Sequence, residues 1–239
     1  TDKMSNPYFQ FKQFTVWHDK CAMKVGTDGV LLGAWTPVES AHRILDIGTG
    51  TGLVALMLAQ RSLPDANIVA LEIDEAAVGQ ARENIIRSPW KERVEVVQAD
   101  FKKYRSSDKF DVIVSNPPYF VDSLECPDRQ RAAARHNDSL TYEDLLEGVS
   151  GLLAEDGFFT MVIPADVAER VKKIAYMRKL YAVRQLNVIT KPGGIPKRVL
   201  ITFSFSNQEC IVEELLTELA RHQYSEEYMT LTRDYYLNM

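Results

Sequence analysis

A glycine-rich turn between a short apolar segment and a helical one constrains the fold of this chain more than any other feature. Residues 43–47 are mostly β-branched or apolar, residues 53–60 have a helix-forming composition, and Gly48, Gly50 and Gly52 alternate between them. Alternating glycines let the backbone adopt positive φ angles and approach a ligand closely at the start of the helix. The sequence therefore predicts a strand, a tight turn and a helix, with a ligand site at the turn.

The same alternation of strands and helices continues along the chain, which is typical of an α/β fold with a mostly parallel sheet. Further strands are predicted over 68–73, 94–98, 110–114 and 157–163, with helices over 74–87, 142–153 and 165–177. Asp74 is well placed as the N-cap of the first of these helices. Strands over 181–189 and 198–205 are separated by only a short turn-rich loop, which is too short for a crossover helix. These two strands should form an antiparallel hairpin that ends the sheet.

Three acidic residues lie near the ends of predicted strands. Asp46 lies in the first strand, Glu72 lies near the end of the second, and Asp100 comes shortly after the third. The carboxyl ends of parallel strands share one edge, where an acidic side chain at the Glu72 position can accept hydrogen bonds from ribose hydroxyls. A nicotinamide enzyme would use the same geometry, although its glycines are spaced Gly-x-Gly-x-x-Gly. Asp100 is also explained as an ordinary turn or cap residue.

The second motif, Asn116, Pro117, Pro118 and Tyr119, follows the strand predicted over 110–114. The prolines cannot continue a central strand, so the motif should lie at the same sheet edge. A conjugated amino group is a poor nucleophile, and acceptors on its hydrogens would stabilise the charge that develops on nitrogen. The Asn116 side-chain oxygen and the Pro117 carbonyl could accept these hydrogens, while Tyr119 could stack on a flat group. Taken alone, the motif is equally explained as a rigid surface turn.

Together the two motifs resemble those of class I methyltransferases that use S-adenosylmethionine and methylate a planar amino group. The resemblance implies a seven-stranded Rossmann-like sheet, mostly parallel, with a C-terminal antiparallel hairpin. It implies that Asp46 lies by the methionine portion of the cofactor and that Asp100 hydrogen-bonds its adenine. The expected cofactor-binding residues from this resemblance are Asp46, Gly48, Gly50, Gly52, Glu72, Ile73, Asp100, Phe101 and Asn116.

The tetrapeptide alone leaves three kinds of amino group open: adenine N6 in DNA or RNA, guanine N2 in ribosomal RNA, and glutamine in release factors. Release-factor enzymes carry a helical N-terminal domain, for which residues 1–40 leave little room. Segments 11–14, 21–29, 116–120 and 231–237 closely resemble bacterial tRNA adenine-N6 methyltransferases that modify the adenine beside the anticodon of valine tRNA. That resemblance implies a tRNA substrate and places Lys24, Thr27 and Asp28 over the methionine end of the cofactor.

The net charge of −5 means that contacts with RNA must come from local basic patches. Candidates for phosphate contacts are Arg129, Arg131, Arg135, Lys191, Lys197 and Arg198. Each cluster is equally well explained as a solvated surface. An RNA-binding protein with a relict cofactor pocket is the non-enzyme alternative. The sequence does not indicate an oligomeric state.

The chain is expected to form a single methyltransferase domain over 1–239. Residues 1–40 form an extension with a strand or hairpin over 9–16 and a short helix capped by Thr27 or Asp28, 41–206 the catalytic core, and 207–239 a C-terminal helix and tail. The three cysteines are far apart and form no Cys-x-x-Cys pair, so neither a metal site nor a disulfide framework is expected. No membrane-length apolar run or signal peptide is evident, so a cytoplasmic protein is expected.

Overall fold

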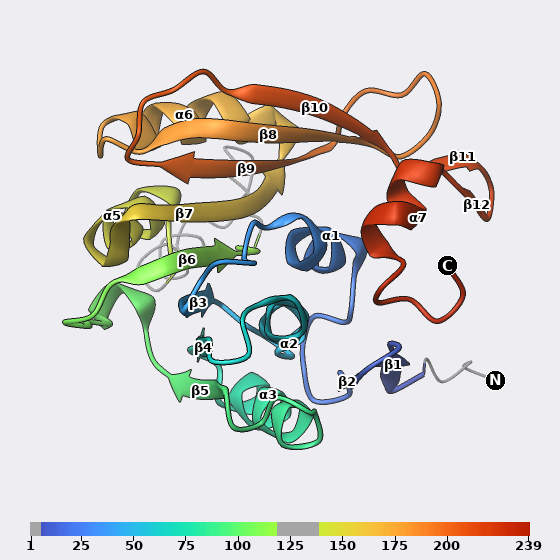
Figure 1. Cartoon of the computed structure of the whole chain (residues 1–239), viewed down its shortest axis with the longest axis horizontal. Coiled ribbons are helices and arrows are strands. Elements are labelled where there is room, and N and C mark those ends of the chain that lie inside the picture. The colour runs from blue at the N-terminus through green and yellow to red at the C-terminus, as the bar shows by residue number, and fades with distance from the viewer. Residues whose placement is uncertain (1–5, 119–138) are drawn as a thin grey trace, which may run out of the picture.

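The computed structural model describes residues 6–118 and 139–239, which form a central sheet with helices on both faces (Figure 1). The strands of the sheet are β3 (Arg43–Ile47), β4 (Asn67–Glu72), β5 (Val94–Gln98), β6 (Phe110–Ser115), β7 (Leu153–Pro164), β8 (Tyr181–Ile189), β9 (Arg198–Ser204) and β10 (Ile211–Leu216). Their order is β10-β8-β9-β7-β6-β3-β4-β5. Strand β9 is antiparallel to both neighbours, and the other neighbouring pairs are parallel. The α/β class and the β8–β9 hairpin are thus confirmed.

Two hydrophobic clusters cover the two faces of the sheet. The first includes side chains from α1 (Thr27–Trp35), α2 (Leu53–Arg61) and α3 (Glu75–Ile86). The second includes side chains from α5 (Tyr142–Leu152) and α6 (Ala168–Tyr176), with Phe101 from the short 3-10 helix η1 (Phe101–Lys103). Another 3-10 turn, η2 (Ala165–Val167), leads into α6. Because both faces are covered, β3, β4 and β6 are almost continuously apolar, as central parallel strands usually are.

The structure adds an eighth strand to the seven that the sequence predicts. Residues 207–239 were expected to hold only a helix and a tail, but Ile211–Leu216 pairs in parallel with β8 as the edge strand β10. The first four residues of β10 are exposed, so it shows no alternation of buried and exposed positions. The hairpin β11 (Glu218–Ala220) and β12 (Gln223–Tyr224) follows, and then the expected helix α7 (Glu226–Thr232).

Helix ends agree with the sequence in one case and differ in another. The Asp74 side chain accepts a hydrogen bond from the Ala77 amide at 2.9 Å, so Asp74 caps α3 as expected. The prediction that Thr27 or Asp28 caps α1 is wrong, because the cap position is Gly26 and carries no side-chain bond. Asp28 lies in the first turn instead, where its carboxylate pairs with Arg198 at 3.1 Å.

The N-terminal segment forms the expected hairpin from β1 (Tyr8–Gln10) and β2 (Thr15–Trp17). Phe11 and Phe14 stack with ring centroids 4.8 Å apart and are buried, whereas Phe9 is 36% exposed. The backbone amide of Lys12 donates to the Tyr235 carbonyl at 2.8 Å. The hairpin therefore packs on the C-terminal tail.

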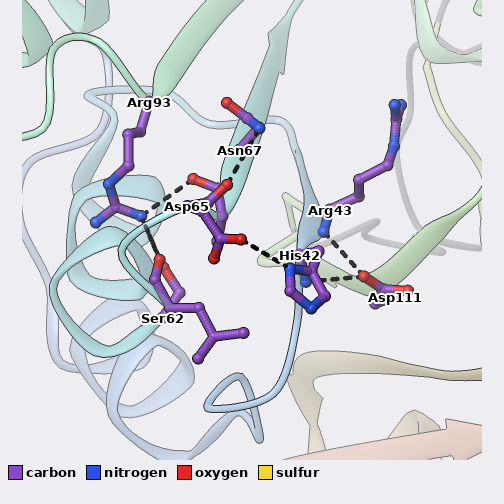
Figure 2. A network of polar contacts seen from close by, with 9 residues as sticks. His42, Arg43, Ser62, Asp65, Asn67, Arg93 and Asp111 are labelled. Carbon is purple, nitrogen blue, oxygen red and sulfur yellow. Dashed lines mark hydrogen bonds and ion pairs between the residues drawn. The ribbon is translucent and has the colours of Figure 1, made fainter.

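A polar network holds the amino ends of β3, β4 and β6 together, at the edge opposite the glycine turn (Figure 2). One Asp111 carboxylate oxygen accepts both the His42 and the Arg43 amides at 2.9 Å. Arg93 donates to the Ser62 hydroxyl at 3.2 Å and to the carbonyls of the last turn of α2 and the loop after it. These contacts fix where β3 and β4 begin, and hence which residues reach the opposite edge.

We expect Asp111→Ala to lower the free energy of unfolding by about 1–3 kcal/mol, because two strand-end amides lose their acceptor. Urea denaturation followed by circular dichroism measures this change. The control is Asp108→Ala, which removes only a solvent-exposed ion pair with Arg43 and should cost less than about 1 kcal/mol. Equal losses in the two variants would show that Asp111 does not stabilise this edge.

Candidate active site

The glycine turn has the backbone geometry that its sequence predicts. Gly48, Gly50 and Gly52 have φ angles of 73°, 55° and 85°. The amides of Gly48 and Thr49 donate to the Leu71 carbonyl at 2.9 and 2.8 Å, which ties the turn to the end of β4. A Cβ atom built on Gly48 or Gly50 would meet nothing within 4 Å, so the space above the turn is open. The turn can therefore receive a ligand against its backbone.

Asp46 lies beneath this turn and is only 2% exposed. Its carboxylate accepts a hydrogen bond from the Thr49 hydroxyl at 2.7 Å. Burial raises the pKa of Asp46 to about 7, and the nearby charge of Glu72 adds to that rise, while the Thr49 bond opposes it. A cationic ligand beside Asp46 would favour the ionised carboxylate, so the site suits a positively charged group.

Glu72 ends β4 and joins the turn from the neighbouring strand. One carboxylate oxygen accepts the Gly50 amide at 2.9 Å, and the other accepts the amides of Ile73 and Asp74 at 2.9 and 3.0 Å. These backbone bonds fix the orientation of the carboxylate at the sheet edge. The Ile73 side chain beside it is 59% exposed and can contact a ligand.

Asp100 and Phe101 follow β5 at the same edge. The Asp100 side chain accepts the Lys102 amide at 3.0 Å and so caps η1, which is the structural role that the sequence left open. The Phe101 ring is buried in the core, where it fills the space left by Gly148 of α5. A contact of either residue with adenine stays a prediction.

The described part of the second motif lies at the end of β6, directly beside β3. Ile47 and Ser115 are register partners, and the Ser115 hydroxyl donates to the Ile47 carbonyl at 3.1 Å. Asn116 is therefore held level with Gly48 on the adjacent strand. A Cβ built on Gly29 of α1 would lie 3.9 Å from Asn116 Nδ2, so α1 packs closely against this side chain. Pro117 is buried and Pro118 exposed, while Tyr119 lies outside the described residues.

The residues expected over the methionine end of the cofactor lie along the segment that leads into α1. Lys24 and Thr27 are exposed, and Asp28 pairs with Arg198 at the start of β9. Burial is the main cause that raises the pKa of the Cys21 thiol to about 11, and the nearby charges of Glu72 and Asp74 add to the rise. The segment between β2 and α1 therefore lies beside the cofactor edge, although its contacts with a cofactor stay predictions.

The basic residues expected to contact RNA divide into two groups. Lys191 and Lys197 are exposed in the loop between β8 and β9. Strand β8 runs in the same direction as β6, β7 and β10. The loop that follows β8 therefore lies at the same sheet edge as Asn116, which follows β6. The other group, Arg129, Arg131 and Arg135, lies outside the described residues.

Asn84 of α3 is a structural contact of the site that the sequence did not reveal. Its side-chain amide is fully buried and donates to the carbonyls of Trp17 and Thr51 at 2.9 and 2.8 Å. The oxygen accepts the Trp17 amide at 2.9 Å. Asn84 thus connects the N-terminal hairpin to the glycine turn. Its spacing of four residues from the buried Gln80 was a signal, because such residues share one helix face.

Residues 6–118 and 139–239 contain no group of three or more His, Cys, Asp or Glu side chains placed to hold a metal ion. Across these same ranges, no helix combines the length and the apolar character needed to cross a membrane.

The geometry fits S-adenosylmethionine. The open backbone turn, the buried carboxyl group of Asp46 and the fixed carboxylate of Glu72 can receive the methionine and ribose portions of such a cofactor. Residues 23–187 also match the family model described as "Methyltransferase small domain". Fold and site together define a methyltransferase that uses S-adenosylmethionine.

Similar proteins narrow the family. The chain is 78% identical to a tRNA1(Val) (adenine(37)-N6)-methyltransferase of Bacteroides thetaiotaomicron, over 99% of this chain and 100% of that protein. It is 44% identical to a protein of the same name from Yersinia enterocolitica, over 96% of this chain and 92% of that one. The chain therefore belongs to the tRNA1(Val) (adenine(37)-N6)-methyltransferase family, within the methyltransferase small domain group.

Solved structures support the fold alone. A predicted O-methyltransferase from Agrobacterium tumefaciens superposes with a TM-score of 0.69 and 19% identity, over 89% of this chain and 100% of that one. TrmN from Thermus thermophilus gives a TM-score of 0.53 and 19% identity, over 74% of this chain and 47% of that one. Both similarities agree with the class I methyltransferase architecture.

The raised pKa of Asp46 predicts a measurable dependence of stability on pH. Between about pH 4 and pH 7 the folded protein holds a proton that the unfolded chain has lost, so Asp46 makes the folded state less stable as the pH rises. Asp46→Asn should remove this effect. The free energy of unfolding of the variant, minus that of the parent, should grow by up to a few kcal/mol across this window and then level off.

Urea denaturation at several pH values measures this difference, with Asp108→Asn as a control that neutralises an exposed carboxylate. The control should give a small difference that does not grow across the window. A constant difference between Asp46→Asn and the parent from pH 4 to pH 8 would show that Asp46 is ionised normally.

Proposed function

We propose that this chain transfers a methyl group from S-adenosylmethionine to the N6 amino group of an adenine in tRNA, namely the adenine at position 37 of tRNA1(Val), the substrate in its relatives' names. The observation that carries the chemistry is the placement of Asn116 beside the glycine turn, held by the Ser115 bond to Ile47. The choice of adenine and of tRNA is supported by the relatives.

Asn116 and Pro117 would act on the amino group of the base. The lone pair of an exocyclic amino nitrogen is delocalised into the ring, which makes the nitrogen a poor nucleophile. The nitrogen gains positive charge as it forms the bond to the methyl carbon. The Asn116 side-chain oxygen and the Pro117 carbonyl would accept its two hydrogens and stabilise this charge where it develops. They would also orient the lone pair, which lowers the entropic cost of reaction. Neither residue needs to remove a proton before the transition state.

The cofactor would be held by residues of the adjacent strands. Asp46 and the turn from Gly48 to Gly52 would hold its methionine end, Glu72 its ribose, and Asp100 its adenine. When bound, S-adenosylmethionine supplies a methyl group on a positively charged sulfur, which makes the methyl group electrophilic. Pro117, which is buried, and α1, which packs on Asn116, would help exclude water from the reacting atoms.

We also propose that the chain acts as one domain over 1–239. The N-terminal hairpin packs on the C-terminal tail, and Asn84 joins the hairpin to the glycine turn. A tRNA substrate would place the enzyme in the cytoplasm.

Asn116→Ala tests the role of this side chain. We expect methyl transfer to fall by roughly 100-fold to 1,000-fold, the usual effect of losing one hydrogen bond to a charge that develops in the transition state. Cofactor affinity, measured by calorimetry, should stay close to that of the parent. The control, Asn67→Ala, removes an exposed amide at the opposite edge of the sheet and should leave turnover unchanged. Equal turnover in parent and Asn116→Ala would contradict the proposed role.

The Tyr119 side chain supplies a second comparison. Tyr119→Phe should reduce turnover only slightly because the ring remains, whereas Tyr119→Ala should reduce turnover severely. Similar losses in both variants would point to the hydroxyl instead of the ring.

The acceptor is identified by incubating the protein with radiolabelled S-adenosylmethionine and, separately, tRNA, ribosomal RNA, DNA and a release factor. Nucleoside analysis should find label in N6-methyladenine from tRNA. Label in methylated guanine would instead indicate a guanine-N2 methyltransferase of ribosomal RNA, and label in glutamine would indicate a glutamine methyltransferase of release factors. Failure to bind the cofactor in calorimetry would favour the RNA-binding alternative.

A further inference from the structure

A cavity of about 520 Å³ lies on the far side of Asn116 from the cofactor residues. It is bordered by the N-terminal hairpin, the first turns of α1, the loop between β8 and β9, and the C-terminal segment from β11 to the tail. Its volume falls within the roughly 300–1,000 Å³ of small-ligand sites. None of the residues named for cofactor or catalysis lines it, apart from Thr27 and Asp28 at the start of α1.

The sheet places this cavity at the same edge as Asn116. Strands β8 and β10 point toward the same edge as β6, and the segments that follow them line the cavity. Figure 1 shows α1, α7 and the β11–β12 hairpin gathered at this end of the sheet. In strand order, the cofactor residues follow β3, β4 and β5, Asn116 follows β6, and the cavity lies beyond it. The cavity and the residues that follow β3, β4 and β5 therefore lie on opposite sides of Asn116 along this edge.

The lining of the cavity combines the features that bind a single base. Tyr224 is 38% exposed, and its ring lies 5.4 Å from that of the buried Tyr228, so one ring is supported by the other. Lys197 also lines the cavity. Glu218 supplies a carboxylate, which accepts hydrogen bonds from the amino and imino groups of bases. Such a lining suits a flat polar ring better than a free phosphate.

The wall that carries Tyr224 is well anchored. The Ser225 hydroxyl caps α7 by accepting the Tyr228 amide at 3.0 Å and donates to the Leu216 carbonyl. Farther along, the Tyr235 hydroxyl donates to the Met57 carbonyl of α2 at 3.1 Å. Tyr235 is only 1% exposed. These bonds hold the wall that carries Tyr224 in place, which lowers the entropic cost of binding a ligand there.

We propose that this cavity binds one unpaired nucleotide of the substrate RNA, next to the nucleotide whose amino group reaches Asn116. Its base stacks on Tyr224, and its phosphate lies near Lys197. The inference rests on the proposed function in so far as the substrate is RNA. Single-stranded RNA is commonly recognised in this way, with a base on an aromatic ring and its edge hydrogen-bonded.

The test uses the full chain and an anticodon-arm RNA hairpin that carries 2-aminopurine beside the target adenine. Stacking quenches the fluorescence of this base, so a titration reports both affinity and stacking. Tyr224→Ala should weaken hairpin binding and raise the KM for RNA by about tenfold or more. The kcat and the affinity for the cofactor should remain close to those of the parent. Tyr224→Trp should restore both binding and quenching.

The matched control is Tyr176→Ala. Tyr176 is also exposed and also contacts a second tyrosine ring, but it ends α6, and its partner Tyr181 lies at the amino end of β8. This variant should bind and methylate the hairpin as the parent does. Circular dichroism confirms that each variant is folded, and Lys197→Ala, a substitution in an exposed loop, should weaken RNA binding independently.

The outcomes separate this inference from the proposed function. Equal hairpin affinity in Tyr224→Ala and Tyr176→Ala would overturn the inference and assign the cavity to another occupant, such as a segment of a second copy of the chain. Failure of the parent to bind or quench the hairpin would also overturn it. If the parent binds and quenches but transfers no methyl group, the inference stands and the proposed function fails.

Discussion

The parallel pairing of β3 with β4 on one side and with β6 on the other is the constraint on which the site depends. Register partners at the strand ends bring the glycine turn level with Glu72 and Asn116, although these residues are far apart in the sequence. The polar network at the amino edge fixes where the strands begin. The arrangement has an electrostatic cost, because it buries Asp46 beneath the turn and raises its pKa to about 7. A cationic cofactor would offset that cost.

Much of this arrangement could be predicted from the sequence, because central parallel strands and amphipathic helices have clear apolar patterns. The turn from Gly48 to Gly52, the Asp74 cap and the β8–β9 hairpin all followed from local chemistry. Strand β10 did not, since its first four residues are exposed and show no period. An edge strand with little buried surface leaves almost no signal in a single sequence.

Contacts between distant residues explain the other differences. The pairing of Arg198 with Asp28 joins residues 170 positions apart, and an RNA contact of Arg198 stays a prediction. The role of Asn84 depends on the N-terminal hairpin folding back onto α3. Tyr224 and Tyr228 could not be recognised as cavity residues from the sequence, because the cavity forms only where the C-terminal tail packs beside β8. Local patterns predicted the glycine turn and the strands around it, whereas the cavity beside β8 depends on tertiary packing.

The central claim is that one sheet edge holds cofactor and RNA on opposite sides of Asn116. Amide hydrogen exchange measured by mass spectrometry tests it, with S-adenosylmethionine and the RNA hairpin added separately. The cofactor should protect the glycine turn and residues 72–74, whereas the RNA should protect the β8–β9 loop and residues 218–236. Protection of a single shared region by both ligands, or RNA protection confined to the glycine turn, would contradict the account.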